Sequence, residues 1–278
     1  LTSLTSIGHI STIGVLQITG NDALTNLNGL ENITALGVGN HIISDNPSMT
    51  DIGGLKNTTS IGGSLELSNL PQVESLSALS NVTTIEYGLT ISNMPLLTSL
   101  DGLQNSTIVQ SEQVSIRNNQ LLASLSKISN FSRVTGLEIT GNPLLTDLDG
   151  LQNLTIVDGS LFIFHNSALT SLNGLQNLTT AGGEGLYIAN NAALTSLDGI
   201  QSLAWFAYLD VSSNQSLTDC AIYAICAKFL DNNDLGPITI ANNAPGCNSP
   251  AEVASQCTKA YVVVEVQTDD NSDCSSGT

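Results

Sequence analysis

The side chains that most often carry catalysis are scarce in this chain and lie far apart. The three histidines, His9, His41 and His165, are widely separated, and G-x-S-x-G, H-E-x-x-H and phosphate-binding glycine motifs are absent from the sequence. Glu138 and Asp210 form a pair of carboxylates at equivalent positions of two repeats, but we expect no Lys or Arg beside them. The sequence therefore predicts a protein that is not an enzyme and uses no cofactor.

Metal binding has a similarly weak basis. Asp147, Asp149 and Asp198 could hold calcium, but no D-x-D-x-D-G loop is present. Acidic and amide residues that precede glycine are typical of tight turns, since both tolerate a positive φ. We therefore predict no metal site.

Aromatic side chains provide the one unusual surface. Phe162 and Phe164 should point outward from one strand, with Tyr187 level with Phe162 on the next strand and His165 nearby. Glu138 and Asp210 should flank these rings in the same outward column. Such a surface could stack on sugars or dock a protein. Alternatively, residues 261–266 or another chain could cover it.

Eight N-x-[ST] sequons occur in the chain. They are acceptor motifs for N-glycosylation, and seven of them are in register in the repeat. Glycans on successive strands only about 4.8 Å apart would crowd one another, so a structural ladder of Asn and Thr is the competing interpretation. The sequon asparagines are Asn32, Asn57, Asn81, Asn105, Asn130, Asn153, Asn177 and, outside that column, Asn214.

All five cysteines lie after residue 219, so they belong to one local structure. Their offsets within adjacent repeats predict the disulfides Cys220–Cys247 and Cys226–Cys257, and hence an oxidising compartment. Zinc is the rival interpretation, but paired CxxC spacings and a nearby histidine are missing. Cys274 is left over and could bridge to another chain.

The elements that must position these residues come from an internal repeat of 23 to 25 residues, L-x-I-x-x-N-x-x-L-T-x-L-x-G-L-x-N-x-T-x-I-x-G. The L-x-I segments alternate apolar and polar residues, as half-buried strands do. His41 falls in an inward aliphatic column, and we expect it to be a structural histidine. A column of Asn residues follows most of the strands, interrupted by Leu70 and Met94, and these inward side chains should bridge neighbouring turns. The repeats start at Leu16, His41, Leu65, Leu89, Val114, Leu137, Leu161, Leu186, Leu209 and Ile238.

The L-x-I-x-x-N-x-x-L segment resembles part of a leucine-rich repeat. The whole unit resembles the receptor L-domain-like solenoids of secreted surface proteins, over about residues 1–257. This resemblance implies an extracellular or surface-attached binding or structural role without naming a ligand. Few helix signals are present, so we expect a flat, three-sided, right-handed parallel β-solenoid of about ten turns. It belongs to the all-β class.

Three segments follow from these patterns: a repeat solenoid at 1–219, a disulfide-locked cap with the last turn at 220–257, and an extra strand with an acidic tail at 258–278. Residues 1–14 match only the second half of a unit, so the first turn should be partly uncovered. Missing preceding residues, a partner chain or a loose first turn could each account for that.

The net charge of the chain limits the classes of partner that it can bind. Twenty-four acidic residues against six basic ones give a net charge of −18, which disfavours nucleic acid and anionic membranes. No apolar stretch is long enough to span a bilayer, so we expect no membrane insertion. The prediction is a non-enzymatic extracellular structural or adhesive protein, self-assembling head to tail into a fibre, whose partners are its own copies, surface proteins or glycans. The alternative is a carbohydrate-binding or other ligand-binding, receptor-like ectodomain.

Overall fold

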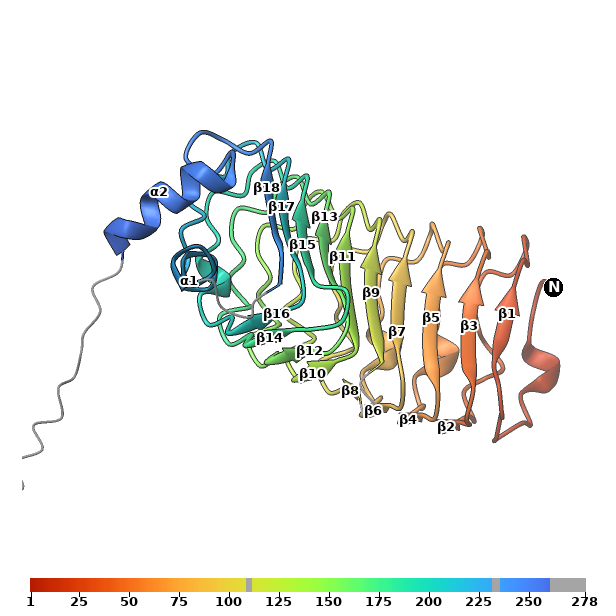
Figure 1. Cartoon of the computed structure of the whole chain (residues 1–278). Coiled ribbons are helices and arrows are strands. Elements are labelled where there is room, and N and C mark those ends of the chain that lie inside the picture. The colour runs from red at the N-terminus through yellow and green to blue at the C-terminus, as the bar shows by residue number, and fades with distance from the viewer. Residues whose placement is uncertain (109–111, 232–235, 261–278) are drawn as a thin grey trace, which may run out of the picture.

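The computed structural model describes residues 1–108, 112–231 and 236–260, which form a parallel β-solenoid (Figure 1). One ten-stranded parallel sheet runs along the molecule, in the order β1-β3-β5-β7-β9-β11-β13-β15-β17-β18. Its strands are Gln17–Thr19, Asn40–Ser44, Ser64–Ser68, Leu89–Ser92, Gln113–Arg117, Gly136–Thr140, Leu161–Phe164, Leu186–Ala189, Leu209–Ser212 and Ile238–Ala241. The predicted fold class is confirmed, with every one of these strands at a predicted repeat start.

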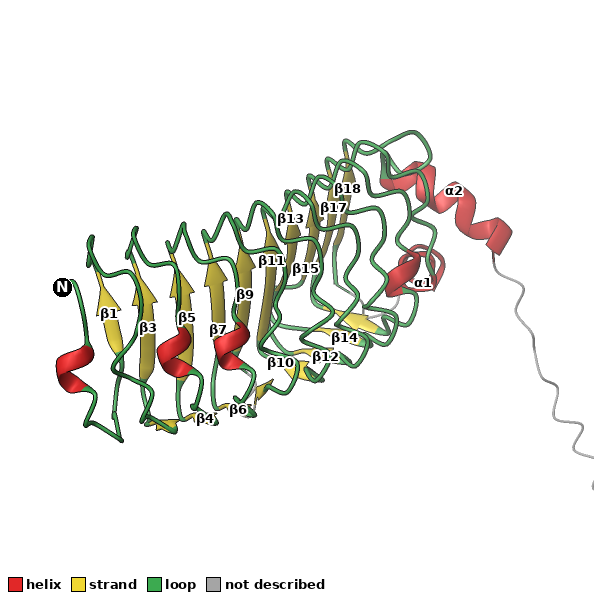
Figure 2. Ribbon diagram, turned by 180° about the vertical axis from the view of Figure 1, so that it is seen from behind, coloured by secondary structure: helices red, strands yellow, loops and turns green. Residues whose placement is uncertain are grey.

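A second side of the solenoid carries two short sheets of two-residue strands. The first has the order β2-β4-β6-β8 and the second β10-β12-β14-β16. These strands are Ala35–Leu36, Ser60–Ile61, Thr84–Ile85, Thr107–Ile108, Arg133–Val134, Ile156–Val157, Thr180–Ala181 and Trp205–Phe206. The third side consists of turns that include the 3-10 helices Thr5–Ile7, Gly53–Leu55, Ser77–Leu79 and Asp198–Ile200, several of which are visible in Figure 2.

The rod is less straight than the sequence suggests. Both ribbon views show the second half turning away from the line of the first half near β9 and β11. The short-strand side is interrupted at the same level, between β8 and β10. The bend and the division of the second side into two sheets therefore lie at the same level of the rod.

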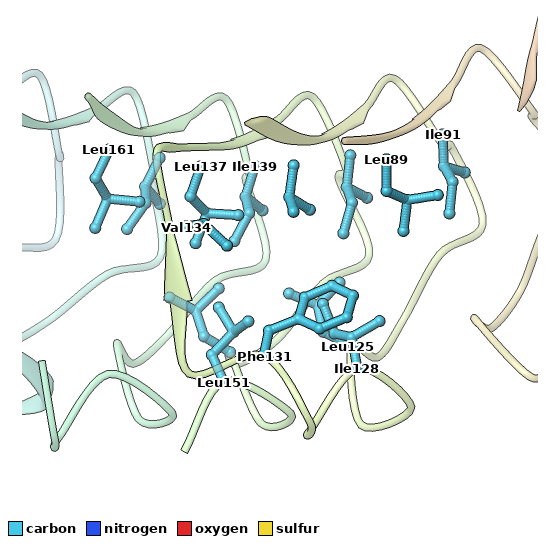
Figure 3. Packing of buried hydrophobic residues seen from close by; sticks show 14 of the residues in the cluster. Leu89, Ile91, Leu125, Ile128, Phe131, Val134, Leu137, Ile139, Leu151 and Leu161 are labelled. Carbon is cyan, nitrogen blue, oxygen red and sulfur yellow. The ribbon is translucent and has the colours of Figure 1, made fainter. Parts of the chain in front are cut away.

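Aliphatic side chains from all three sides fill the interior. Leu137 and Ile139 point inward from β11 and meet Leu151 and Val134 from the other two sides, each no more than 2% exposed (Figure 3). Identical columns on every turn allow the side chains to stack at the density of a normal protein core. The apolar period of the sequence therefore sets both the strand spacing and the inward face.

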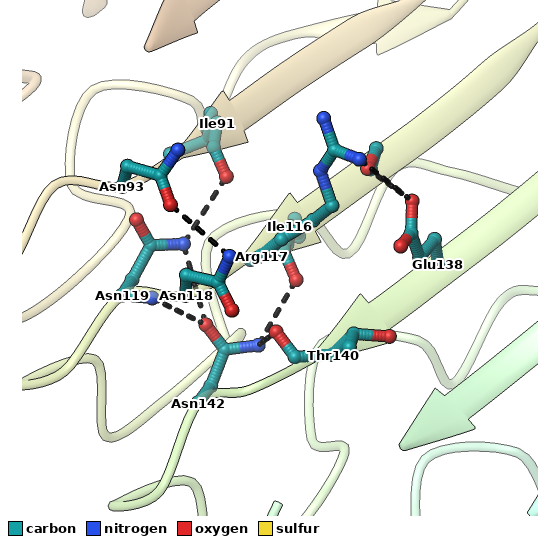
Figure 4. Close-up of polar contacts among 10 residues, drawn as sticks. Ile91, Asn93, Ile116, Arg117, Asn118, Asn119, Glu138, Thr140 and Asn142 are labelled. Atoms are coloured by element: carbon teal, nitrogen blue, oxygen red, sulfur yellow. Dashed lines mark hydrogen bonds and ion pairs between the residues drawn. The ribbon is translucent and has the colours of Figure 1, made fainter. Parts of the chain in front are cut away.

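Buried asparagines join consecutive turns, as predicted. The Nδ2 of Asn142 donates to the Ile116 carbonyl at 2.9 Å, and its Oδ1 accepts from the Asn119 backbone N–H at 3.1 Å (Figure 4). The same pattern recurs at Asn166 and Asn191. Each amide thus pairs backbone groups that the turns would otherwise bury without partners.

His41 occupies the inward column and is fully buried, in agreement with the structural interpretation. Its Nδ1 accepts from the Leu16 N–H at 3.2 Å, while its Nε2 lies 2.8 Å from the Gly37 carbonyl, where it acts as the donor. Burial lowers the pKa of His41, and the hydrogen bond to Gly37 opposes that effect. The neutral ring is therefore the form that the fold accommodates.

Two helices and both predicted disulfides cap the C-terminal end. Helices α1 (Tyr223–Asp231) and α2 (Pro250–Ala260) pack against each other, and α2 also contacts β18. Ser249 caps α2 by accepting from the Glu252 N–H at 3.3 Å. The Glu252 carboxylate accepts from the backbone N–H groups of Gly246 and Asn248.

Disulfides connect Cys220 to Cys247 and Cys226 to Cys257, with Cα atoms 5.5 and 5.1 Å apart. The predicted strand at 261–266 and Cys274 lie outside the described residues.

Candidate functional site

Four aromatic side chains gather on the outer face of the long sheet. We call Phe162, Phe164, Tyr187 and Tyr208 the aromatic cluster. Ring centroids are 5.0 Å apart for Phe162 and Tyr187, 5.6 Å for Phe162 and Phe164, and 5.4 Å for Tyr187 and Tyr208. The register pairs Phe162 with Tyr187 across β13 and β15, as predicted. The chain has only eleven Phe, Tyr and Trp residues in all, so four on one face is a marked concentration.

The rings are half-buried rather than fully exposed, because they cover one another. Tyr208 was missed by the sequence reasoning, since it precedes the L-x-I segment of its repeat. Its hydroxyl lies 2.6 Å from the Thr239 Oγ1, and the Tyr187 hydroxyl donates to the Glu184 carbonyl at 3.0 Å. These two bonds fix the phenol rings and leave part of each ring surface accessible.

The same packing affects the ionisation of Tyr187. Burial raises the pKa of its phenol, and the nearby Glu184, Tyr208 and Asp210 add to the effect by disfavouring a further negative charge. Tyr187 therefore stays neutral across the physiological pH range and presents an uncharged ring.

Glu138 is held by neighbours that the sequence reasoning did not anticipate. Its carboxylate accepts from the Ser115 hydroxyl at 2.7 Å and lies 3.8 Å from the Arg117 guanidinium (Figure 4). The expectation that no basic residue lies beside the acidic pair is therefore wrong. Arg117 lies on the adjacent strand β9, two residues beyond Ser115, which is the residue that pairs with Glu138 in the compared column.

Asp210 lies in the same outward column as Glu138, as predicted, with Phe162 and Tyr187 between them. Its Oδ1 is buried and has no hydrogen-bond partner among the described residues. Three strand spacings place the two carboxylates about 14 Å apart. Paired acids that hydrolyse glycosides are separated by no more than about 9.5 Å. These two carboxylates cannot work as such a pair.

Two hollows open on this face beside the aromatic cluster. The first, of about 280 Å³, is lined by residues that include Thr90, Arg117 and Glu138. The second, of about 320 Å³, has Phe162 and Glu184 in its lining. The Gln113 side chain belongs to both hollows. We call the two hollows together the sheet trough.

His165 lies at the edge of the aromatic cluster, with its ring centroid 6.5 Å from that of Phe164. It is exposed and has a positive φ of 56°. This backbone conformation belongs to the position, since the equivalent residues after the other strands also have φ values of 53 to 59°, and Gly occupies the position twice. The strain at His165 is therefore a property of the repeat rather than a sign of a reactive histidine. Its equivalents are Asp45, Asn69, Asn93, Asn118, Asn190, Ser213 and Asn242, with Gly20 and Gly141 at the remaining two positions.

The seven aligned sequon asparagines are exposed, and each bonds to the preceding turn. The Nδ2 of Asn153 donates to the Ser129 carbonyl at 2.7 Å, and the hydroxyl of Thr155 in the same sequon donates to the Ser132 carbonyl at 3.1 Å. Both sequon positions therefore have a structural use that is independent of glycosylation. The other six Asn side chains, Asn32, Asn57, Asn81, Asn105, Asn130 and Asn177, make the equivalent bond at 2.5 to 2.9 Å.

Asn214 differs from the seven aligned asparagines. It is fully buried in the inward column, where its Nδ2 donates to the Ile188 carbonyl at 2.9 Å. A glycan at Asn214 is incompatible with this fold, because the attached sugar would have no route to solvent.

Two further hollows lie away from the aromatic cluster. A groove of about 620 Å³ follows Pro47, Pro71 and Pro95 beside a ladder of exposed amides, in which Asn118 donates to Asn93 and Asn93 to Asn69. A second hollow, of about 330 Å³, has apolar residues such as Leu1, Ile13 and Val15 in its lining. It adjoins β1, which is the first strand of the long sheet among the described residues. It includes the first turn, which is partly uncovered as predicted.

Within the described ranges, no three His, Cys, Asp or Glu side chains come together in a way that could hold a metal ion. Neither of the helices there, α1 nor α2, is long and apolar enough to cross a membrane.

No known protein family matches the sequence. No curated protein matches it either.

Proposed function

We propose that this chain is a non-enzymatic, extracellular adhesive protein that binds its partners through the outer face of the long sheet. The observation that supports this most is the aromatic cluster, which places four half-buried rings on three adjacent strands of a rigid surface. Interfaces are enriched in Tyr and Phe because rings offer a large contact area at low entropic cost. The two disulfides support an oxidising, extracellular location.

The proposal includes a relationship to leucine-rich-repeat and receptor L-domain solenoids. The Asn column and the L-x-I strands are features that these folds use, and their outer sheet faces suit protein and glycan recognition. Surface glycans and surface proteins are the proposed partners, with no role for nucleic acid or membrane lipid.

Adhesion can be measured with beads coated with the oxidised, purified chain. We expect the beads to attach to cell surfaces, and attachment to fall sharply for the double variant Phe162→Ala, Tyr187→Ala. Trp205→Ala is the matched control, because Trp205 is an exposed ring on β16, on another side of the solenoid. Equal attachment by the wild type and the double variant would show that the outer face is not the adhesive surface.

Self-assembly into a head-to-tail fibre stays a prediction. It would bury the apolar hollow beside β1 against another copy, because β1 has only β3 as a long-sheet neighbour among the described residues and such an edge accepts an incoming strand. Sedimentation velocity over a range of concentrations under oxidising conditions tests it. A single monomeric species at high concentration contradicts it.

A further inference from the structure

The sheet trough has the lining of a site for a hydrophilic ligand rather than for an apolar protein side chain. Thr90, Arg117 and Glu138 contribute hydroxyl, guanidinium and carboxylate groups to the first hollow. Gln113 adds an amide shared by both hollows, and Phe162 adds a ring to the second. Sites for small ligands usually combine an aromatic surface with a few polar groups.

Glycines create the room for a ligand on either side of Gln113. Gly136 pairs with Gln113 in the sheet register, so it lies in the same outward column, and it borders the second hollow. Gly88 borders the first. A side chain at Gly136 would project into the trough, whereas a Cβ at Gly88 would lie 2.8 Å from the Gln113 carbonyl oxygen, so both positions favour glycine.

We infer that the sheet trough binds a neutral oligosaccharide, with one pyranose ring stacked on Phe162 and a later sugar residue of the same chain in the hollow on the far side of Gln113. This inference rests on the proposed adhesive function and names its ligand class. The C–H face of a pyranose complements the negative face of an aromatic ring, and its hydroxyls both donate to and accept from Gln113, Glu138 and Arg117. The oligosaccharide runs along the rod axis, across strands β7 to β15.

Charge selects a neutral ligand over an acidic one. Glu112, Glu138 and Glu184 line the trough, and Arg117 is the one basic residue in its lining. Arg117 already pairs with Glu138. Uronic acids and sulfated sugars would therefore meet net repulsion, in a chain whose overall charge is −18.

Gly136 allows a test that blocks the trough without removing any contact. A Cβ on Gly136 would lie 3.5 Å from the Gln113 Cγ, an ordinary contact, and its backbone φ is not positive. Gly136→Leu should therefore fold normally and fill the second hollow. By contrast, a Cβ at Gly159 would overlap the backbone of the preceding turn, so that glycine is unsuitable.

The experiment is isothermal titration calorimetry with cello-, chito-, manno- and xylo-oligosaccharides, oligogalacturonate, heparin fragments and chitosan oligomers. We expect a neutral oligosaccharide to bind the wild type, and Phe162→Ala and Gly136→Leu each to weaken it by about tenfold or more. Trp205→Ala should bind within about twofold of the wild type. Circular dichroism confirms that each variant is folded, and Gly136→Leu decides the result if Phe162→Ala is unstable.

Three outcomes overturn the inference: no neutral oligosaccharide binds, the acidic or cationic sugars bind instead, or both trough variants bind as the wild type does. The bead assay separates this failure from failure of the proposed function. Attachment that persists in Gly136→Leu but is lost in Phe162→Ala, Tyr187→Ala, without sugar binding, indicates a protein partner on the same face. Absence of attachment by the wild type removes the adhesive function itself.

Discussion

Replacing Asn166 by Ala should destabilise the solenoid far more than an ordinary Asn→Ala change. The Asn166 side chain is fully buried. Its Nδ2 donates to the Ile139 carbonyl at 2.9 Å, and its Oδ1 accepts from the Asn142 N–H at 3.1 Å. Truncation leaves these two backbone groups buried without partners, at a cost of about 1–3 kcal/mol each. The expected loss is therefore about 4 kcal/mol, a large part of the free energy of unfolding of a typical domain.

Guanidinium denaturation followed by far-UV circular dichroism measures this loss. With an m value of about 5 kcal/mol/M, the midpoint should fall by about 0.8 M. Asn28→Ala is the matched control, because the Asn28 side chain is exposed, and we expect it to change stability by no more than about 0.5 kcal/mol. If Asn166→Ala and Asn28→Ala unfold at the same denaturant concentration, the buried Asn column does not hold the turns together.

Three further predictions concern pH, the sequons and the cap. His41 takes up a proton near pH 6.5 in the unfolded chain, whereas burial lowers its pKa in the folded chain, so the free energy of unfolding should be at its full value above that pH and fall as the pH drops below it. His41→Leu should remove this part of the pH dependence, which is measured by comparing denaturation midpoints at pH 7.5 and pH 5.5. Asn153→Ala should lower stability by about 1 kcal/mol even in unglycosylated protein, because it removes the bond to the preceding turn, and unchanged melting would favour a purely glycan-related role. Replacing Cys226 and Cys257 by Ser together should cost about 3.5 kcal/mol, measured by thermal melting, and unchanged melting would mean that the bond does not stabilise the cap.

The inward-pointing side chains and the strand register of this structure were predictable from the sequence. Leu161 and Ile163 had to point to the core and pair with Leu186 and Ile188, because a shift of one residue would expose every aliphatic side chain of the strand. The same reasoning placed Phe162 beside Tyr187. The disulfide partners followed as well, since similar offsets in adjacent turns bring side chains within bridging distance.

The rest depended on features that the repeat does not encode. Tyr208 and Arg117 lie one or two positions outside the column that was compared, so their contacts with Tyr187 and Glu138 needed the rotation of the strands in space. The bend near β9 lies at the level where the second side is divided between two short sheets, a division that the repeat pattern does not predict. The sequons were ambiguous for a chemical reason: the Asn and Thr that accept a glycan are also the residues that bond to a neighbouring turn.

The contrast between inward and outward positions indicates which surface of this solenoid carries function. Inward positions need aliphatic side chains, and most positions of the column after the strands hold an Asn that pairs buried backbone groups, with Leu70 and Met94 as the exceptions. Outward positions on the long sheet carry no such requirement, and most hold Ser, Thr or another small or polar residue. Phe162, Phe164 and Tyr187 gain little for the fold by lying there half-buried, since smaller residues serve on the other strands. Local departures of this kind are expected at functional sites, which is why the aromatic cluster and its trough, rather than the repeat itself, should determine what the protein binds.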